Sequence, residues 1–262
     1  MAVLFPKKVP AFSRALGEVD DAFDEEPSFL NNIHTSLSFE ELQNVPEMIN
    51  NVIIGIGDIC CEFLTCHCQC ANMSKVKIIK FTPPESPVVE CTAFLCESSI
   101  IVWLCHTKED DNVFGLSNLV ESLLSSFSVN EHCAFYIFSS EYSHRSQFPS
   151  FAPKLRSPFV RKLHTSRFEC RHVDQNIPML EQPNVISGFA GELLSRLTYR
   201  RYAGCLYILF YDASFPLSNA AIFSAIGHCV ISLPGLKHLQ PPDSSRFLES
   251  GRANMSHGQL YI

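Results

Sequence analysis

The chain has 262 residues, a formal net charge of −7, 46% hydrophobic residues and 18% charged residues, a composition typical of globular proteins. This composition excludes a chain that is disordered over most of its length. The acidic balance also disfavours nucleic acid as a partner, because phosphate binding requires a basic surface.

The sequence contains no apolar run close to the roughly 20 residues that a membrane-spanning helix requires. The apolar start, Met1–Phe5, is too short for the core of a signal peptide. We therefore expect no membrane partner and a location in the cytoplasm or the nucleus. The twelve cysteines lie mostly in apolar segments, which favours buried, reduced thiols over a disulfide framework.

Six acidic side chains lie within residues 18–26 of the N-terminal segment, and that short stretch contains no basic residue to compensate their charge. Segments that combine high charge with few groups to bury remain unfolded. We predict a disordered acidic arm over residues 1–34. Its acidic group consists of Glu18, Asp20, Asp21, Asp24, Glu25 and Glu26.

Strand and helix patterns alternate in the following segment. Residues 37–42 and Asn51–Gly57 are predicted strands, and a helix is expected from Asp58 to about Cys70. Prolines then interrupt the chain. After them, Thr92–Cys96 and Ile100–His106 have the apolar and β-branched character of buried strands.

A helix, a strand and a long loop are predicted in the middle of the chain. Apolar residues at helical spacing predict a helix over residues 113–127, and the apolar run Cys133–Phe138 predicts a buried strand. Residues 139–158 are rich in Ser and Pro and are expected to form an exposed loop. Because proline suits a first helical turn, a short helix is predicted over residues 157–164.

The clearest pattern is a helix followed by a buried strand. Pro183 excludes helix immediately before it, Asn184 is a candidate N-cap, and Gly204 is the expected end of the helix. The run Cys205–Tyr211 is apolar on both faces, as in a fully covered strand. The buried helix face is predicted to contain Val185, Ile186, Phe189, Ala190, Leu193, Leu194 and Leu197.

Buried strands that alternate with amphipathic helices predict an α/β fold, with a mostly parallel central sheet and helices on both faces in a three-layer sandwich. We expect one domain over residues 35–247, with its last helix at residues 216–230. Residues 248–262 are mostly small and polar and are predicted to be a flexible tail.

Gly55 and Gly57 follow a predicted strand, as in the phosphate-binding turn of dinucleotide-binding folds. The third glycine position of that motif holds Cys60, so a tight strand-to-helix turn is the favoured interpretation. The chain also lacks a nucleophile elbow, a zinc-hydrolase motif and a phosphate-binding loop. We predict no catalytic residue and no cofactor. A small-molecule or nucleotide-binding enzyme on an α/β sheet is the alternative.

A cluster of soft metal ligands lies on the predicted helix that begins at Asp58. Structural zinc sites use paired ligands on turns, whereas a helix distributes its residues around its circumference. We interpret the cysteines as packing thiols and predict no metal, with a zinc-stabilised interaction module as the alternative. The cluster contains Cys60, Cys61, Cys66, His67, Cys68 and Cys70.

Residues 145–171 carry seven basic side chains and one acidic one, Glu169. A solvated face explains such a run, and a docking surface for an acidic protein is the functional alternative.

The sequence ends in a hydrophobic residue, a tyrosine and an α-carboxylate after a polar segment. Leu260 and Tyr261 supply apolar area, and the carboxylate of Ile262 can pair with a lysine or with backbone donors. These three residues are the predicted partner-binding residues.

Several segments resemble the proteasome assembly chaperone family. The resemblance lies in Ser157–Leu163, in Leu180–Val185 with its Leu-Glu-Gln-Pro-Asn motif, and in the strand Leu206–Leu209. The strand Val52–Gly57 and the terminal Leu-Tyr-Ile also fit, so the resemblance covers most of the chain after the acidic arm.

The resemblance implies a non-enzymatic assembly chaperone of the 20S proteasome. Such a protein acts as a heterodimer with proteasome assembly chaperone 2, binds α-subunits, promotes α-ring formation and prevents off-pathway α-ring dimers. By position, Leu260, Tyr261 and Ile262 would dock in a pocket between neighbouring α-subunits. A cysteine-rich helix is not a hallmark of this family, which weakens the zinc alternative.

Overall fold

The structure is a computed structural model, and its described residues all fall within Thr35–Ile262. They are residues 36–41, 48–67, 73–82, 88–96, 99–107, 116–143, 157–169, 177–212 and 224–227. The predicted acidic arm (1–34) and the predicted tail (248–262) lie outside them, so the proposed domain boundaries stay a prediction.

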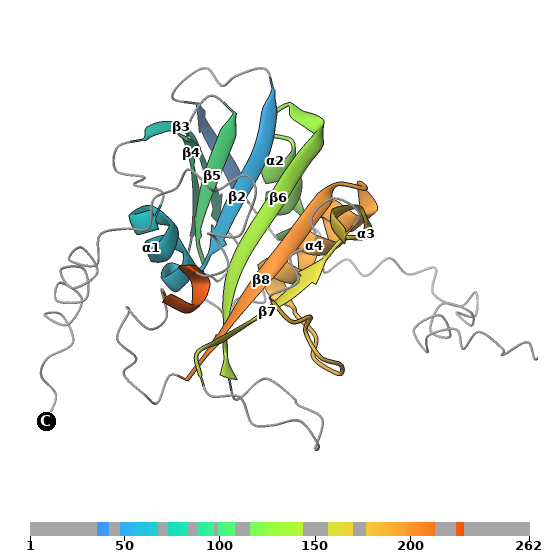
Figure 1. The fold of residues 1–262 in the computed structure, drawn as a ribbon. Coiled ribbons are helices and arrows are strands. Elements are labelled where there is room, and N and C mark those ends of the chain that lie inside the picture. The colour runs from blue at the N-terminus through green and yellow to red at the C-terminus, as the bar shows by residue number, and fades with distance from the viewer. Residues whose placement is uncertain are drawn as a thin grey trace, which may run out of the picture. The chain divides into compact units, whose positions relative to one another are not determined.

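The described strands form one eight-stranded sheet in the order β1-β3-β4-β5-β2-β6-β8-β7 (Figure 1). The four central strands β5, β2, β6 and β8 run parallel to one another, whereas the pairs β1/β3, β3/β4, β4/β5 and β7/β8 are antiparallel. The strands are β1 (Ser36–Glu41), β2 (Ile49–Ile56), β3 (Ser74–Thr82), β4 (Val89–Cys96), β5 (Ile100–His106), β6 (Val129–Tyr142), β7 (Phe159–His164) and β8 (Ala203–Tyr211).

The prediction of a mostly parallel sheet is wrong, because four of the seven neighbouring pairs in the described sheet are antiparallel. β3 and β7 take part in three of these four pairs, and the sequence analysis predicted neither of them as a strand. With β3 in place, only short connections separate β3 from β4 and β4 from β5. Short connections produce antiparallel hairpins, whereas parallel neighbours require a crossover of a dozen or more residues.

The labelled helices are α1 (Asp58–His67), α2 (Leu116–Leu124), α3 (Ser166–Glu169) and α4 (Gly188–Tyr199). Within the described part of the chain, no helix has the length and apolar character that a membrane crossing requires. Residues 224–227 are also helical and fall within the helix predicted at residues 216–230.

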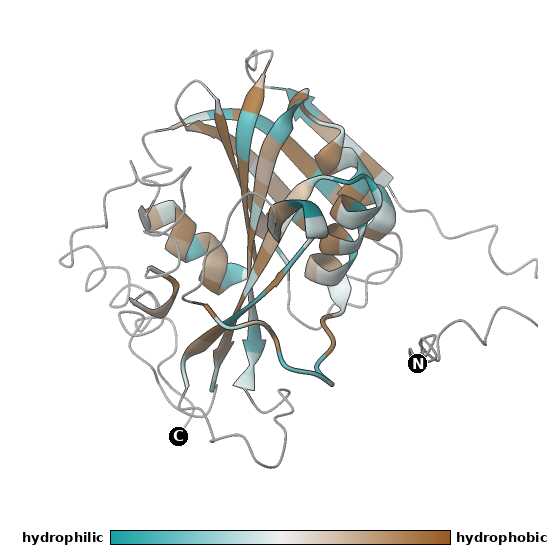
Figure 2. Ribbon diagram, turned by 45° about the vertical axis from the view of Figure 1, so that its right-hand side comes forward, coloured by the Kyte–Doolittle hydropathy of each residue, from teal (hydrophilic) through white to brown (hydrophobic). Residues whose placement is uncertain are grey.

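The two faces of the sheet support two separate cores. Because side chains alternate along a strand, Val52 and Ile54 of β2 pack with α2 and α4, whereas Ile53 packs with α1. Figure 2 shows the apolar residues that run along the central strands between these helices. Helices therefore cover both faces, as predicted, while the description as a three-layer sandwich stays a prediction.

The central strands confirm three sequence predictions. The predicted strands 51–57, 100–106 and 205–211 correspond to β2, β5 and β8. Almost every residue of these strands is buried, because the sheet is covered on both faces at its centre. β6 extends beyond the predicted end at Phe138 to Tyr142, so the expected loop 139–158 begins with strand.

Strand β7 contradicts the helix predicted at residues 157–164. Phe159–His164 is extended and pairs along its whole length with β8, with Phe159 opposite Phe210 and Leu163 opposite Leu206. The Phe159 and Phe210 rings stack at 5.1 Å between centroids. Backbone pairing with the edge of β8 outweighs the local helical signal, since tertiary contacts routinely override propensity.

Helix α4 begins later than predicted. Its first residue is Gly188 and its N-cap is Ser187, whereas Asn184 lies in a preceding turn, where its side-chain amide donates to Glu181 O at 2.7 Å. Gly204 does not end the helix either. It belongs to β8, where an added Cβ would lie 2.7 Å from Leu197 Cδ1, so the glycine allows α4 to pack closely on the strand.

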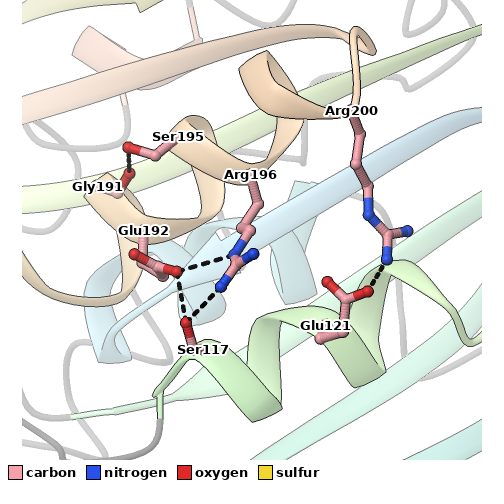
Figure 3. A network of polar contacts seen from close by, with 7 residues as sticks. All are labelled: Ser117, Glu121, Gly191, Glu192, Ser195, Arg196 and Arg200. Atoms are coloured by element: carbon pink, nitrogen blue, oxygen red, sulfur yellow. Dashed lines mark hydrogen bonds and ion pairs between the residues drawn. The ribbon is translucent and has the colours of Figure 1, made fainter.

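Helices α2 and α4 are joined by a polar network (Figure 3). Ser117 Oγ donates to Glu192 Oε1 at 2.8 Å, and Arg196 reaches both Glu192 Oε1 and Ser117 Oγ, at 3.1 and 2.8 Å. One turn further along α4, Arg200 pairs with Glu121 of α2. The network fixes the register of the two helices on the side that faces away from the sheet.

Candidate functional site

The residues predicted to bind a partner, Leu260, Tyr261 and Ile262, lie outside the described residues. Their docking role stays a prediction. The other segments that carried the sequence resemblance are described, and the structure brings two of them together.

The segment that follows Pro178 covers the outer edge of β7. Lys162 N donates to Pro178 O at 3.0 Å, and Leu180 N donates to Lys162 O at 2.9 Å. Lys162 and Met179 form an isolated parallel bridge. The Leu-Glu-Gln-Pro-Asn motif therefore begins as a cover of the sheet edge, which protects backbone groups that an open edge would expose.

A buried ion pair locks this cover in place. Arg161 Nε donates to both carboxylate oxygens of Glu181, at 2.8 and 2.9 Å, and its guanidinium also donates to Val160 O at 3.0 Å. The same guanidinium lies 5.1 Å from the centre of the Phe159 ring. The Arg161 side chain is 8% exposed and that of Glu181 is 30% exposed, so the pair is largely removed from water.

The covering segment leaves two apolar side chains in solvent. Met179 is 44% exposed and Val185 is 84% exposed. The sequence analysis placed Val185 on the buried face of a helix, which is wrong because α4 begins three residues later. The prolines at positions 178 and 183 were the available signal that this segment is not helical.

The glycine turn after β2 has a packing explanation. An added Cβ at Gly55 would lie 2.8 Å from Leu64 Cδ1 and 3.2 Å from Cys60 O, so this glycine lets α1 pack against β2. Gly57 has a φ of +80°, the left-handed conformation that glycine adopts without strain. These two requirements account for the glycines without a phosphate ligand, so the nucleotide-binding alternative loses the observation that motivated it.

The cysteines of α1 are part of the core. Cys60 and Cys61 are fully buried, and Cys61 Sγ donates to Gly55 O at 3.4 Å. Burial raises the pKa of the Cys61 thiol far above its usual value, and the nearby Cys60 and Cys91 thiols add to this effect. Burial likewise raises the pKa of Cys105, which shares a hydrogen bond with Cys91. Neutral, buried thiols behave as apolar side chains.

No group of three potential ligands in the described part of the chain is arranged to hold a metal ion. Cys68 and Cys70 of the predicted cluster lie outside the described residues. For the described cysteines of α1, packing is the role that the geometry supports.

The basic stretch 145–171 is described only in part, and its described members serve the fold. Arg161 is buried in its pair with Glu181, and Lys162 is 9% exposed. Arg167 donates to Arg201 O at 2.8 Å and to Glu131 O at 2.9 Å. Neither a solvated face nor an open docking surface describes these three residues. The remaining basic residues, Arg145, Lys154, Arg156 and Arg171, lie outside the described part.

Comparison with known proteins agrees with the resemblance in the sequence. No family model matches the chain. The chain is 24% identical over 260 residues to proteasome assembly chaperone 1 of Danio rerio, and the match covers 89% of this chain and 91% of the relative. The predicted resemblance to the proteasome assembly chaperone family is thereby confirmed.

Two solved structures from Pyrococcus furiosus share the fold. PbaA, an archaeal homolog of proteasome-assembly chaperone, has a TM-score of 0.53 and 13% identity over 86% of this chain and 94% of its own. PbaB, an archaeal proteasome activator, has a TM-score of 0.54 and 13% identity over 85% of this chain and 96% of its own. None of these three names describes an enzyme, in agreement with the prediction that the chain is not one.

Proposed function

We propose that this chain is a non-enzymatic assembly chaperone of the 20S proteasome. It acts as a heterodimer with proteasome assembly chaperone 2, in the cytoplasm and the nucleus. The heterodimer binds α-subunits, promotes the formation of their ring and prevents off-pathway dimers of α-rings.

The observation that carries this proposal is the sequence match to proteasome assembly chaperone 1, which spans nearly the whole of both chains. The shared fold with PbaA and PbaB supports it independently of sequence identity. In the structure, Leu180–Val185, one of the segments that carry the resemblance, is held against β7 by the Arg161–Glu181 ion pair and by the hydrogen bond from Leu180 N to Lys162 O.

In this proposal Leu260, Tyr261 and Ile262 dock in a pocket of an α-subunit. The leucine and the tyrosine ring bury apolar area, and the terminal carboxylate pairs with a cation or backbone donors. A polar segment that must be ordered on docking loses conformational entropy, so one tail binds weakly. Pairing the tail with a second surface or with the partner's tail strengthens capture and keeps it reversible, as an assembly factor requires.

The test is purification of the tagged chain from cells, followed by mass spectrometry of the proteins that it retains. We expect proteasome assembly chaperone 2 and free α-subunits with the native chain. Deletion of Leu260–Ile262 should reduce the recovery of α-subunits several-fold and leave the partner chaperone bound.

Two further variants separate the parts of the tail. Tyr261→Ala removes the ring, and one glycine added after Ile262 displaces the carboxylate, so each should weaken capture of α-subunits. Ser256→Ala, in the same polar segment, is the matched control and should leave capture unchanged. If the deletion has no effect on α-subunits, tail docking is wrong; if neither α-subunits nor a second chaperone is retained by the native chain, the proposed function is wrong.

A further inference from the structure

The end of helix α4 contains an arginine in a backbone conformation that favours glycine. Arg201 has a φ of +58°, the only positive value for a residue other than glycine in the described part of the chain. Arg201 N donates to Thr198 O at 3.1 Å, and Tyr202 N donates to Leu197 O at 2.9 Å. This pair of bonds defines a Schellman motif, and its left-handed position is usually occupied by glycine.

A left-handed arginine is conformationally costly, and such residues cluster at ligand-binding sites. The dipole of α4 favours a cation near its C-terminus, but it does not require one at the left-handed position itself, which glycine would occupy without strain. The surroundings of Arg201 suggest a reason.

Arg201 lines an open pocket of about 460 Å³ that is formed by the start of α3 and the end of α4. Arg167, on the wall of this pocket, donates to the carbonyl oxygen of Arg201 itself at 2.8 Å, which fixes the backbone that carries the Arg201 side chain. The pocket is lined by Thr165, Ser166, Arg167, Thr198, Arg201 and Tyr202.

Arg201 differs from the other arginines of this corner. Arg196 pairs with Glu192, Arg200 pairs with Glu121, and Arg167 donates to two backbone carbonyls. Within the part of the chain that the structure describes, the Arg201 guanidinium makes no hydrogen bond or ion pair. Its donors are therefore available to a ligand in the pocket.

The hydroxyl groups of the residues that line the pocket likewise fall into those with a hydrogen-bond partner in the fold and those without one. Thr165 Oγ1 donates to Tyr202 O at 2.9 Å and accepts from Gly204 N at 3.0 Å, and Thr198 Oγ1 donates to Leu194 O at 2.9 Å. These hydroxyls serve the fold. Among the described residues, the Ser166 hydroxyl and the Tyr202 phenol make no hydrogen bond, so both are further donors on residues that line the pocket.

We propose that this pocket is a binding site for a carboxylate presented by an acidic segment of a partner protein, with Arg201 as its principal donor. A guanidinium binds a carboxylate through two parallel hydrogen bonds, and the Ser166 hydroxyl and the Tyr202 phenol can supply the remaining donors. This inference does not depend on the proposed function or on the C-terminal residues.

The donors that line the pocket favour a carboxylate over a phosphate group. A phosphate site concentrates several cationic or backbone N–H donors, whereas this pocket offers one available guanidinium.

The test is a titration of the isotope-labelled full chain with an acetylated, amidated hexaglutamate peptide, followed by nuclear magnetic resonance. We expect saturable shifts of the amide signals of Thr165, Arg167 and Tyr202. In Arg201→Gly the concentration at half-saturation should rise about tenfold or more, because a charge-assisted hydrogen bond is lost. The melting temperature should not fall, since glycine suits the left-handed position.

Lys80→Gln is the matched control, because it removes one positive charge from β3, which lies at the opposite end of the sheet. This variant should bind the peptide as the native chain does. The proposal is overturned if the native chain shows no saturable shift, if Arg201→Gly binds equally well, or if Lys80→Gln loses as much affinity. It is also overturned if inorganic phosphate saturates the same signals at lower concentration than the peptide does.

Discussion

The two edges of the sheet use the same chemistry in different environments. At each edge a basic side chain lies between a carboxylate and a phenylalanine ring. At the β7 edge, Arg161 is 2.8 Å from Glu181 and 5.1 Å from the centre of the Phe159 ring, and its side chain is 8% exposed. Its carboxylate comes from outside the sheet, so the pair fastens the covering segment to the edge.

At the β1 edge, Lys77 of β3 is 3.1 Å from Glu41 and 5.7 Å from the centre of the Phe39 ring. Here the Lys77 side chain is 11% exposed, close to the value for Arg161, but its partner Glu41 is 75% exposed and Phe39 is 53% exposed, so the carboxylate side of this pair is in water. Both partners come from β1 itself, so this arrangement holds only the edge strand.

The difference shows how burial decides what an ion pair does. A pair in water contributes little, because solvent screens it and both side chains lose freedom. A buried pair is costly to break, because the charge that remains has no compensation. The β7 edge is therefore a fixed part of the domain, and the β1 edge is expected to be the weaker one.

The largest effect should come from Glu181→Ala, which leaves the buried Arg161 without its carboxylate. We expect the free energy of unfolding to fall by about 3 kcal/mol, as for other broken buried pairs. Urea denaturation of the full chain measures it. Glu90→Ala, which removes an exposed partner of Lys80 at 3.6 Å, is the control and should change stability little. A loss below about 1 kcal/mol for Glu181→Ala would mean that the pair does not hold the β7 edge.

A second way to weaken the β7 side is Gly204→Ala. The new Cβ would lie 2.7 Å from Leu197 Cδ1 and 3.6 Å from Thr165 Cγ2, so α4 or β8 must shift. Overpacking of this kind should cost about 2 kcal/mol in the same denaturation experiment. Gly227→Ala is the control, because its added Cβ meets no atom within 4 Å. Equal stability of the two variants would contradict the close packing of α4 on β8.

Alkaline pH acts on the centre of the sheet and should affect both edges alike. Burial raises the pKa of Cys133, on β6, from 9.0 to about 12. Below pH 9 the thiol is protonated in both states. Between pH 9 and 12 it ionises only in the unfolded chain, so stability falls as pH rises, by about 1.4 kcal/mol per pH unit.

Comparison with Cys133→Ala isolates this contribution. Between pH 9.5 and 11 the free energy of unfolding of the native chain should fall more steeply than that of the variant. The difference in slope should be about 1.4 kcal/mol per pH unit, the value for the loss of one proton. Glu181→Ala and Glu41→Ala keep the thiol and should retain the native slope. A native chain and a Cys133→Ala variant with the same slope would show that the thiol ionises in the folded state.

The smallest effect is expected at the β1 edge. Glu41→Ala removes the exposed partner of Lys77 and should lower the free energy of unfolding by no more than about 0.5 kcal/mol. Raising the salt concentration should remove this difference, because exposed charges are screened. Glu40→Ala, on the same strand, is the control. A loss as large as that of Glu181→Ala would abolish the distinction between the two edges.

The local sequence pattern was sufficient to predict the strands at the covered centre of the sheet and to identify the resemblance to the proteasome assembly chaperone family. The segments 51–57, 100–106 and 205–211 are apolar on both faces, which only a strand covered on both sides requires, and they are β2, β5 and β8. The turn at Gly57 and the helix that begins at Asp58 were also predictable, because glycine and an acidic first residue mark such a junction.

Tertiary structure decided what happens at the edges. Phe159–His164 has a sequence compatible with a helix, and it is a strand because β8 offers it an open edge. The exposure of Val185 follows from the position of α4, and the pocket at Arg201 joins residues more than 30 positions apart in the sequence. A sequence records the periodicity of each segment, but backbone pairing, burial of an ion pair and the meeting of distant loops depend on partners that no local pattern specifies.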